Sequence, residues 1–316
     1  MSEETKEKLK TGLKQATEKI GETTRKAANG VGAAAGKAKE TAVKAQQSLL
    51  NAMDQNGNGE IDIEDVIVMG LKVPGIKIDR AAFMQKEFQN KLPQSVIDAA
   101  ISENPLKAGI PGELIDKIAD EVIKYERNFV SGISTALGMP GGVAMVATIP
   151  ADIAQYYGYM LRATQKLMYL YGFPAINLDE NGQTFDSETI NILIVCLGVM
   201  YGVAGANTAL KAMAKALAAG VEKQLLRTAL TKGTIYPIVK NVAKWFSVKM
   251  TKEVFAGFFK KAISVVGGVI GGGITFVSFK PCCDKLKASL RNTMLSNPNY
   301  CAAKEDDDLI IVDVDT

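Results

Sequence analysis

Apolar and polar residues follow one another with the spacing of amphipathic helices along much of the chain. Two apolar stripes between residues 90 and 128 consist of Val96, Ile97, Ala100 and Ile101, and then of Leu114, Ile115, Ile118, Val122 and Ile123. The first stripe stops at Asn104-Pro105, and Pro111 is placed to open the second helix. No run alternates with period two for long enough to suggest a sheet. The pattern predicts an all-α protein built as a helical bundle.

Residues 1–50 repeat a weak apolar stripe every eleven residues, and the stripe carries Leu9, Ile20, Val31 and Ala42. A period of 3.67 residues per turn keeps these side chains on one helix face. The segment has a net charge of +4, and its glycines weaken a helix in water. It resembles the eleven-residue repeats of late-embryogenesis-abundant and apolipoprotein-type segments. We expect a long amphipathic helix that forms on an anionic surface; the alternative is a solvated tail.

Three stretches carry no charged residue: Asn128–Ala151, Thr189–Leu210 and Ala262–Phe279. Their lengths are near the number of residues needed to cross a bilayer. They also contain many glycines, with Gly267 and Gly271 in the GxxxG register that lets helices approach closely. The sequence therefore predicts glycine-rich hydrophobic helical hairpins, either buried in a soluble core or inserted in a membrane.

Composition and charge narrow the class of protein. Hydrophobic residues make up 47% of the chain and charged residues 22%, as in soluble globular proteins. The net charge of +3 indicates no nucleic-acid partner. The chain has no histidine, which excludes histidine-dependent nucleophiles and histidine-ligated metals. The start of the sequence has no apolar leader, so we expect a cytoplasmic protein, peripheral to the inner face of the membrane.

The four cysteines have no metal-binding spacing. Pro281 is placed to open a final amphipathic helix, in which Cys282 and Cys283 are adjacent. Adjacent thiols suit a soft metal or oxidation sensing, and the alternative is a structural role.

The segment Asp54–Asp65 fits an EF-hand calcium loop. Ca²⁺ is a hard cation that takes about six to eight oxygen ligands, so the loop supplies an oxygen at every second residue. The predicted ligands are Asp54, Asn56, Asn58, Glu60 through its carbonyl, Asp62 and Asp65. Asp65 is shorter than the glutamate usual at the last position, which predicts weak binding, with a Kd of ~10⁻⁵ to 10⁻³ M. The alternative is a polar turn.

EF-hands usually occur in pairs, and Gly75–Phe83 looks like the back half of a second hand without ligands. Ile76 and Ile78 stand where the first hand has Ile61 and Ile63. Asp79 is expected to cap the helix that follows.

A helix that starts near Pro150 would carry a single polar stripe, made of Asp152, Gln155, Tyr159, Arg162 and Lys166. Asp152 and Arg162 are about 15 Å apart along one helix, so each needs a partner from another helix or from solvent. These charges either orient helices in the core or take part in catalysis.

Gly141-Gly142, Asp152, Arg162 and Tyr171-Gly172-Phe173, together with the glycine-rich segment 265–273, resemble the signature of the bacterial EcsC family. The resemblance covers roughly residues 92–295. It implies a mostly helical protein linked to an ABC-type exporter, with no defined activity and no catalytic set to carry over. Phe173 and Pro174 depart from the family's usual Tyr and Asp.

These observations divide the chain into a conditional helix (1–50), an EF-hand-like module (51–91), an EcsC-like helical domain (92–300) and an acidic tail (301–316). They favour a non-enzymatic calcium-binding accessory protein whose partner is the membrane surface or a membrane protein complex. The alternative is a hydrolase that uses Asp152 with Lys or Tyr partners.

Overall fold

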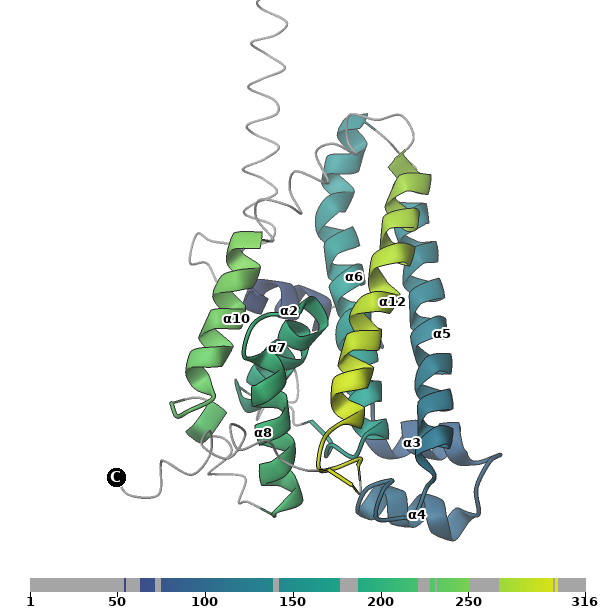
Figure 1. Ribbon diagram of the computed structural model, residues 1–316. Helices are drawn as coiled ribbons and strands as arrows, with labels where there is room; N and C mark the ends of the chain where they lie inside the picture. Colours follow the sequence, from purple (N-terminus) through teal and green to yellow (C-terminus); the bar gives the residue numbers. More distant parts are fainter. Residues whose placement is uncertain are drawn as a thin grey trace, which may run out of the picture. The chain divides into compact units, whose positions relative to one another are not determined.

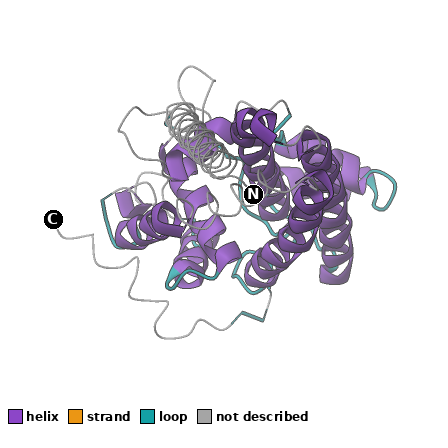
Figure 2. Ribbon diagram, turned by 90° about the horizontal axis from the view of Figure 1, so that it is seen from above, coloured by secondary structure: helices purple, strands orange, loops and turns teal. Residues whose placement is uncertain are grey.

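The protein is all-α in the part that the computed structural model describes: residues 54, 63–71, 75–138, 142–176, 187–220, 228–230, 232–249, 267–297 and 299–300. Figure 2 shows helices joined by loops, with no strand in these residues. The chain divides into two units after Leu50, and every described residue belongs to the second unit, 51–316. The predicted helix over 1–50 and the acidic tail over 301–316 lie outside the described residues.

Three long helices, α5 (Gly112–Gly138), α6 (Gly142–Leu170) and α12 (Gly267–Arg291), pack along one another (Figure 1). Helix α12 runs antiparallel to α5. Ion pairs between the last turns of α12 and the first turns of α5 show this direction: Lys287 pairs with Asp120, and Arg291 with Asp116. The carboxyl end of α5 therefore lies at the same end of this group as the amino ends of α6 and α12.

The two predicted apolar stripes face the core. Helix α4 (Gln94–Ser102) buries Ile97 and Ala100, and α5 buries Ile115, Ile118, Val122 and Ile123. Pro111 stands directly before α5, where its carbonyl accepts the first hydrogen bonds of the helix, from Leu114 and Ile115. The helices predicted from these stripes are confirmed.

Helices α2 (Ile63–Leu71) and α3 (Arg80–Phe88) precede this group. Asp79 caps α3 as predicted, since its side chain accepts a hydrogen bond of 2.6 Å from the Ala82 amide. Arg80 is buried and donates to the carbonyls of Ala100, Ile101, Glu103 and Phe173. One guanidinium thus joins α3 to the end of α4 and to the end of α6.

Helices α7 (Ser187–Tyr201), α8 (Ala206–Ala218) and α10 (Tyr236–Lys249) form the other side of the core. A short turn joins α7 to α8, with left-handed φ angles at Gly202 and Gly205. Gly198 of α7 lies so close to its neighbours that a Cβ there would stand 2.8 Å from Val242 and 2.9 Å from Ala206. The uncharged stretch Thr189–Leu210 is therefore a tightly packed helical hairpin in the core.

The prediction that a final helix opens at Pro281 is wrong. Helix α12 begins at Gly267 and continues through Pro281 to Arg291. A proline inside a helix costs about 3 kcal/mol, because it removes a backbone donor and its ring crowds the preceding turn. The packing of α12 along α5 and the two ion pairs near its end stabilise the continuous helix.

Among the residues that the structure describes, no helix combines the length and the apolar character needed to cross a membrane.

Candidate functional site

The predicted calcium loop leads directly into α2. Ile63 is the first residue of this helix, so Asp65, the last predicted ligand, lies in its first turn and is fully buried. Asp54, the first predicted ligand, is half-buried. Asn56, Asn58, Glu60 and Asp62 lie outside the described residues. Within the described part, no cluster of three carboxylates or cysteines is placed to hold a metal ion.

Helix α2 crosses α6 at two glycines that face each other. A Cβ on Gly70 would lie 3.1 Å from the Gly158 backbone, and a Cβ on Gly158 would lie 3.1 Å from the Gly70 carbonyl. Any larger side chain at either position would separate the two helices. The helix that follows the predicted calcium loop is thus in backbone contact with α6.

Three side chains of α6 bind the segment that follows α2, and one of them, Arg162, belongs to the predicted polar stripe. Arg162 donates to the Gly75 carbonyl. Gln165 donates to the Ile76 carbonyl over 2.9 Å and accepts from the Ile78 amide over 3.0 Å. The Tyr169 hydroxyl donates to the Ile78 carbonyl over 3.3 Å. Side chains of α6 therefore hold the predicted back half of a second hand through the backbone carbonyls and amide of that segment.

Glu126 of α5 is the partner that Arg162 was expected to need from another helix. Its side chain is fully buried, and its Oε1 lies 3.0 Å from Arg162 Nε and 2.6 Å from Lys166 Nζ. Burial lowers the pKa of Lys166, against the opposing effect of the Glu126 carboxylate. No group in the described part hydrogen-bonds to Glu126 Oε2. The three charges form a compact ionic cluster between α5 and α6.

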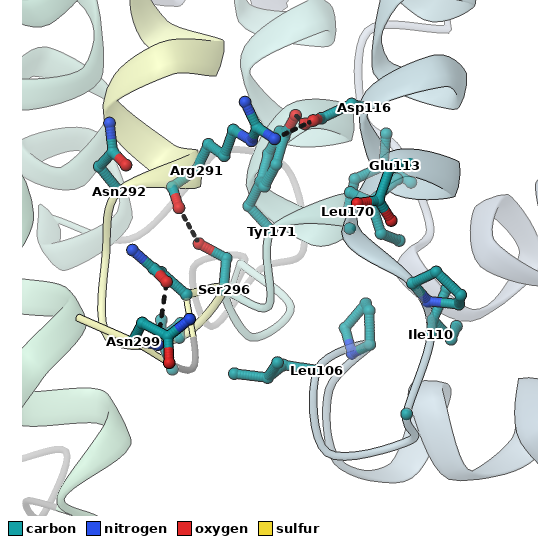
Figure 3. Close-up of a pocket in the computed structure, with 17 residues that line it drawn as sticks. Leu106, Ile110, Glu113, Asp116, Leu170, Tyr171, Arg291, Asn292, Ser296 and Asn299 are labelled. Carbon is teal, nitrogen blue, oxygen red and sulfur yellow. Dashed lines mark hydrogen bonds and ion pairs between the residues drawn. The ribbon is translucent and has the colours of Figure 1, made fainter.

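Tyr171, directly after the carboxyl end of α6, belongs to a second polar cluster (Figure 3). Its hydroxyl donates to one oxygen of Asp116 over 2.8 Å, and Arg291 pairs with the other oxygen over 2.9 Å. Burial, followed by the hydrogen bond to Asp116 and its charge, raises the pKa of Tyr171. The phenol therefore remains protonated near neutral pH and acts as a donor.

This second cluster lines a pocket of about 590 Å³. The pocket lies between the loop before α5, the end of α6 and the turn after α12, which contributes Asn292, Asn297 and Asn299. Gly172 closes α6 with φ +91°, and a Cβ there would lie 2.9 Å from the Leu295 carbonyl. Glycine is thus required at this position by backbone conformation and by space.

Four of the residues named from the EcsC resemblance are candidate site residues: Asp152, Arg162, Tyr171 and Gly172. They do not form one site. Asp152 lies on α6, and its side chain is outside the described part. Arg162 is about 15 Å further along the helix, and Tyr171 is about 28 Å away from Asp152. Arg162 and Tyr171 serve separate clusters, and Gly172 shapes the end of the helix.

Two acidic residues that are central to these clusters, Glu126 and Asp116, were not identified from the sequence. Glu126 occupies a buried position four residues from both Val122 and Val130 on the inner face of α5, and a carboxylate in an apolar stripe is a readable signal. Asp116 follows a buried isoleucine on an ordinary charged face, so no such signal marks it.

The adjacent cysteines are poor candidates for thiol chemistry. Cys283 is buried, Cys282 is half-buried, and both are free. Burial raises the pKa of each thiol, which favours the unreactive protonated form.

Comparison with known proteins found no family model, no curated protein and no solved structure that matches this chain.

Proposed function

We propose that the protein is a non-enzymatic calcium-binding accessory protein that acts at a membrane surface. The observation that carries the calcium part is the start of α2 at Ile63, which puts the last three loop residues in the first turn of a helix. This arrangement suits an EF-hand, whose last ligand comes from the helix that leaves the loop. Asp54 and Asp65 would supply the first and last side-chain ligands.

The contacts of α2 favour a regulatory use of calcium over simple storage. The Gly70–Gly158 crossing and the hydrogen bonds of Arg162 and Gln165 join the residues after the loop to α6. An ion bound in the loop would therefore act on a helix that extends to the far end of the α5–α6–α12 group.

Calorimetric titration of the full chain with Ca²⁺ tests the calcium site. Wild type is expected to bind with a Kd of ~10⁻⁵ to 10⁻³ M, and Asp54→Ala to lose binding, because it removes the ligand at the first position. Asp65→Glu is expected to bind more tightly, since the longer carboxylate can coordinate with both oxygens.

Asp98→Ala serves as the matched control, because Asp98 is an exposed carboxylate on α4, outside the loop. It should bind Ca²⁺ like wild type. Absence of a binding signal from wild type at millimolar Ca²⁺ would end the calcium proposal.

The membrane part of the proposal is supported by the +4 charge of residues 1–50 and by the uncharged stretches Asn128–Ala151 and Ala262–Phe279. Membership of the EcsC family and a link to an ABC-type exporter rest on the sequence resemblance. The hydrolase alternative has less support, because Asp152 is about 21 Å from Lys166 and about 28 Å from Tyr171 along α6.

A further inference from the structure

The carboxyl end of α5 and the amino ends of α6 and α12 lie at the same end of the three-helix group, at the top of Figure 1. We call this end, formed by residues 128–138, 142–151 and 267–279, the uncharged tip. The last charged residue before it on α5 is Arg127, and the first ones after it on α6 and α12 are Asp152 and Lys280. The sequence between α5 and α6 is uncharged as well.

Large apolar side chains are exposed where the uncharged tip begins. Their exposed fractions are 56% for Tyr125, 44% for Phe129, 44% for Phe276 and 71% for Val277. In the described part of the chain, the other exposed large apolar side chain is Met294, beyond the opposite end of α12. Four of these five side chains thus gather at one level of the three-helix group.

Aromatic and basic groups meet at this level. The rings of Tyr125 and Phe129 stack at 6.1 Å, and the Arg127 guanidinium lies 3.9 Å from the centre of the Phe276 ring. Aromatic rings accompanied by a cation are typical of the boundary between lipid tails and headgroups. A purely water-facing surface would not favour such side chains.

The dimensions of the uncharged tip match one leaflet. At 1.5 Å per residue, Asn128–Gly138 spans about 16 Å and Gly142–Ala151 about 15 Å. The hydrocarbon core of a bilayer is about 30 Å thick, so one leaflet supplies about 15 Å. The tip is long enough to enter one leaflet.

We infer that the uncharged tip inserts into one leaflet of a lipid bilayer, with Tyr125, Phe129 and Phe276 at the headgroup boundary. The inference rests on the membrane role proposed above and adds the surface that makes the contact. Lipid fits better than a second copy of the chain, because charge is absent from the tip segments of all three helices and from the sequence between α5 and α6. An interface between copies needs only one apolar face.

Two glycines of α5 provide a matched test. Gly132 lies within the tip and Gly112 at the opposite end of α5; both are exposed, and a Cβ at either would meet nothing within 4 Å. Gly132→Asp and Gly112→Asp should therefore both fold, which circular dichroism checks. Gly132→Leu adds apolar surface at the same place in the tip.

Flotation of the full chain with phosphatidylcholine vesicles in 0.5 M salt removes the electrostatic contribution to binding. We expect wild type and Gly112→Asp to float equally and Gly132→Asp to bind at least tenfold more weakly, because burying a carboxylate in lipid is costly. Gly132→Leu is expected to bind more tightly than wild type.

The other results separate the two proposals. Binding only to anionic vesicles at low salt, equal in both Asp variants, would overturn insertion and keep the membrane role. Absence of binding to any vesicle would overturn both. A dimer in light scattering that Gly132→Asp alone dissociates, with vesicle binding unchanged, would assign the tip to a second copy and overturn insertion.

Discussion

The uncharged stretch Thr189–Leu210 and the uncharged tip of the α5–α6–α12 group have similar compositions and different surroundings. In the first, α7 and α8 bury Leu193, Leu197 and Leu210 against each other and against α10. At the base of the tip, Phe129 and Val277 remain exposed. The comparison teaches that a lack of charge does not by itself distinguish a core helix from a surface that needs a partner.

The two regions also differ in what holds their helices together. Gly198 lets α7 approach α8 and α10 closely, and the contacts around it are apolar. Below the tip, α5 and α6 are joined by the ionic cluster of Glu126, Arg162 and Lys166. Charge removal should therefore damage one region, and added volume should damage the other.

The largest loss in the free energy of unfolding is expected from Glu126→Gln. This change leaves the partly buried cations of Arg162 and Lys166 without their carboxylate, and breaking a buried ion pair costs about 3 to 5 kcal/mol. Urea unfolding followed by circular dichroism measures the free energy of unfolding. The control is Glu103→Gln, because Glu103 pairs with Lys107 in solvent; it should cost less than about 1 kcal/mol. Equal losses in the two variants would show that the cluster does not hold the helices.

A smaller loss is expected from Gly198→Ala, at about 1 to 3 kcal/mol, because the added methyl group would overlap Val242 and Ala206. Gly132→Ala is the matched change at the base of the tip, where a Cβ has open space. It should stabilise α5 by roughly 0.5 to 1 kcal/mol, through the better helix propensity of alanine. If both substitutions changed stability in the same direction, the contrast between packed and open regions would be wrong.

The smallest loss of stability is expected from Tyr169→Phe. Tyr169 lies at the end of α6 away from the tip. Burial raises the pKa of Tyr169 to about 12, against about 10 in an unfolded chain. As the pH rises from about 10 to 12, the unfolded chain releases a proton that the folded chain keeps, so stability falls. Tyr169→Phe should cost about 1 kcal/mol at pH 7 through its lost hydrogen bond to Ile78.

Unfolding titrations at several pH values check this sign. The stability difference between wild type and Tyr169→Phe should shrink between pH 10 and 12. A difference that stays constant over this range would mean that Tyr169 titrates alike in the folded and unfolded chains.

The periodic part of the fold was predictable from the sequence. The apolar stripes gave α4 and α5, and Asp79 was identified as a cap, because spacing and capping are local properties. The start of α12 was not predictable from Pro281, since tertiary packing and ion pairs with α5 outweigh the local preference of a proline.

The clusters were only half predictable. Arg162 was recognised as a charge in need of a partner, but its partner Glu126 lies 36 residues away in the sequence. Asp116 and Arg291 meet only because α5 and α12 are antiparallel, which no local pattern encodes. The Gly70–Gly158 crossing was not predictable either, because the sequence around each glycine does not show that the two face each other in the fold.

If the tip inserts as proposed, Pro281 would limit how far α12 can enter the lipid. Because proline has no N–H, it cannot donate to the carbonyl of Val277, one turn earlier in α12. A carbonyl without a donor costs several kcal/mol in hydrocarbon and little in water. Val277 is also the most exposed apolar side chain at the base of the tip. We therefore expect Val277 to stay at the level of the headgroups, where water can hydrogen-bond to its carbonyl. The part of α12 that precedes Val277 would then be the part that enters the leaflet.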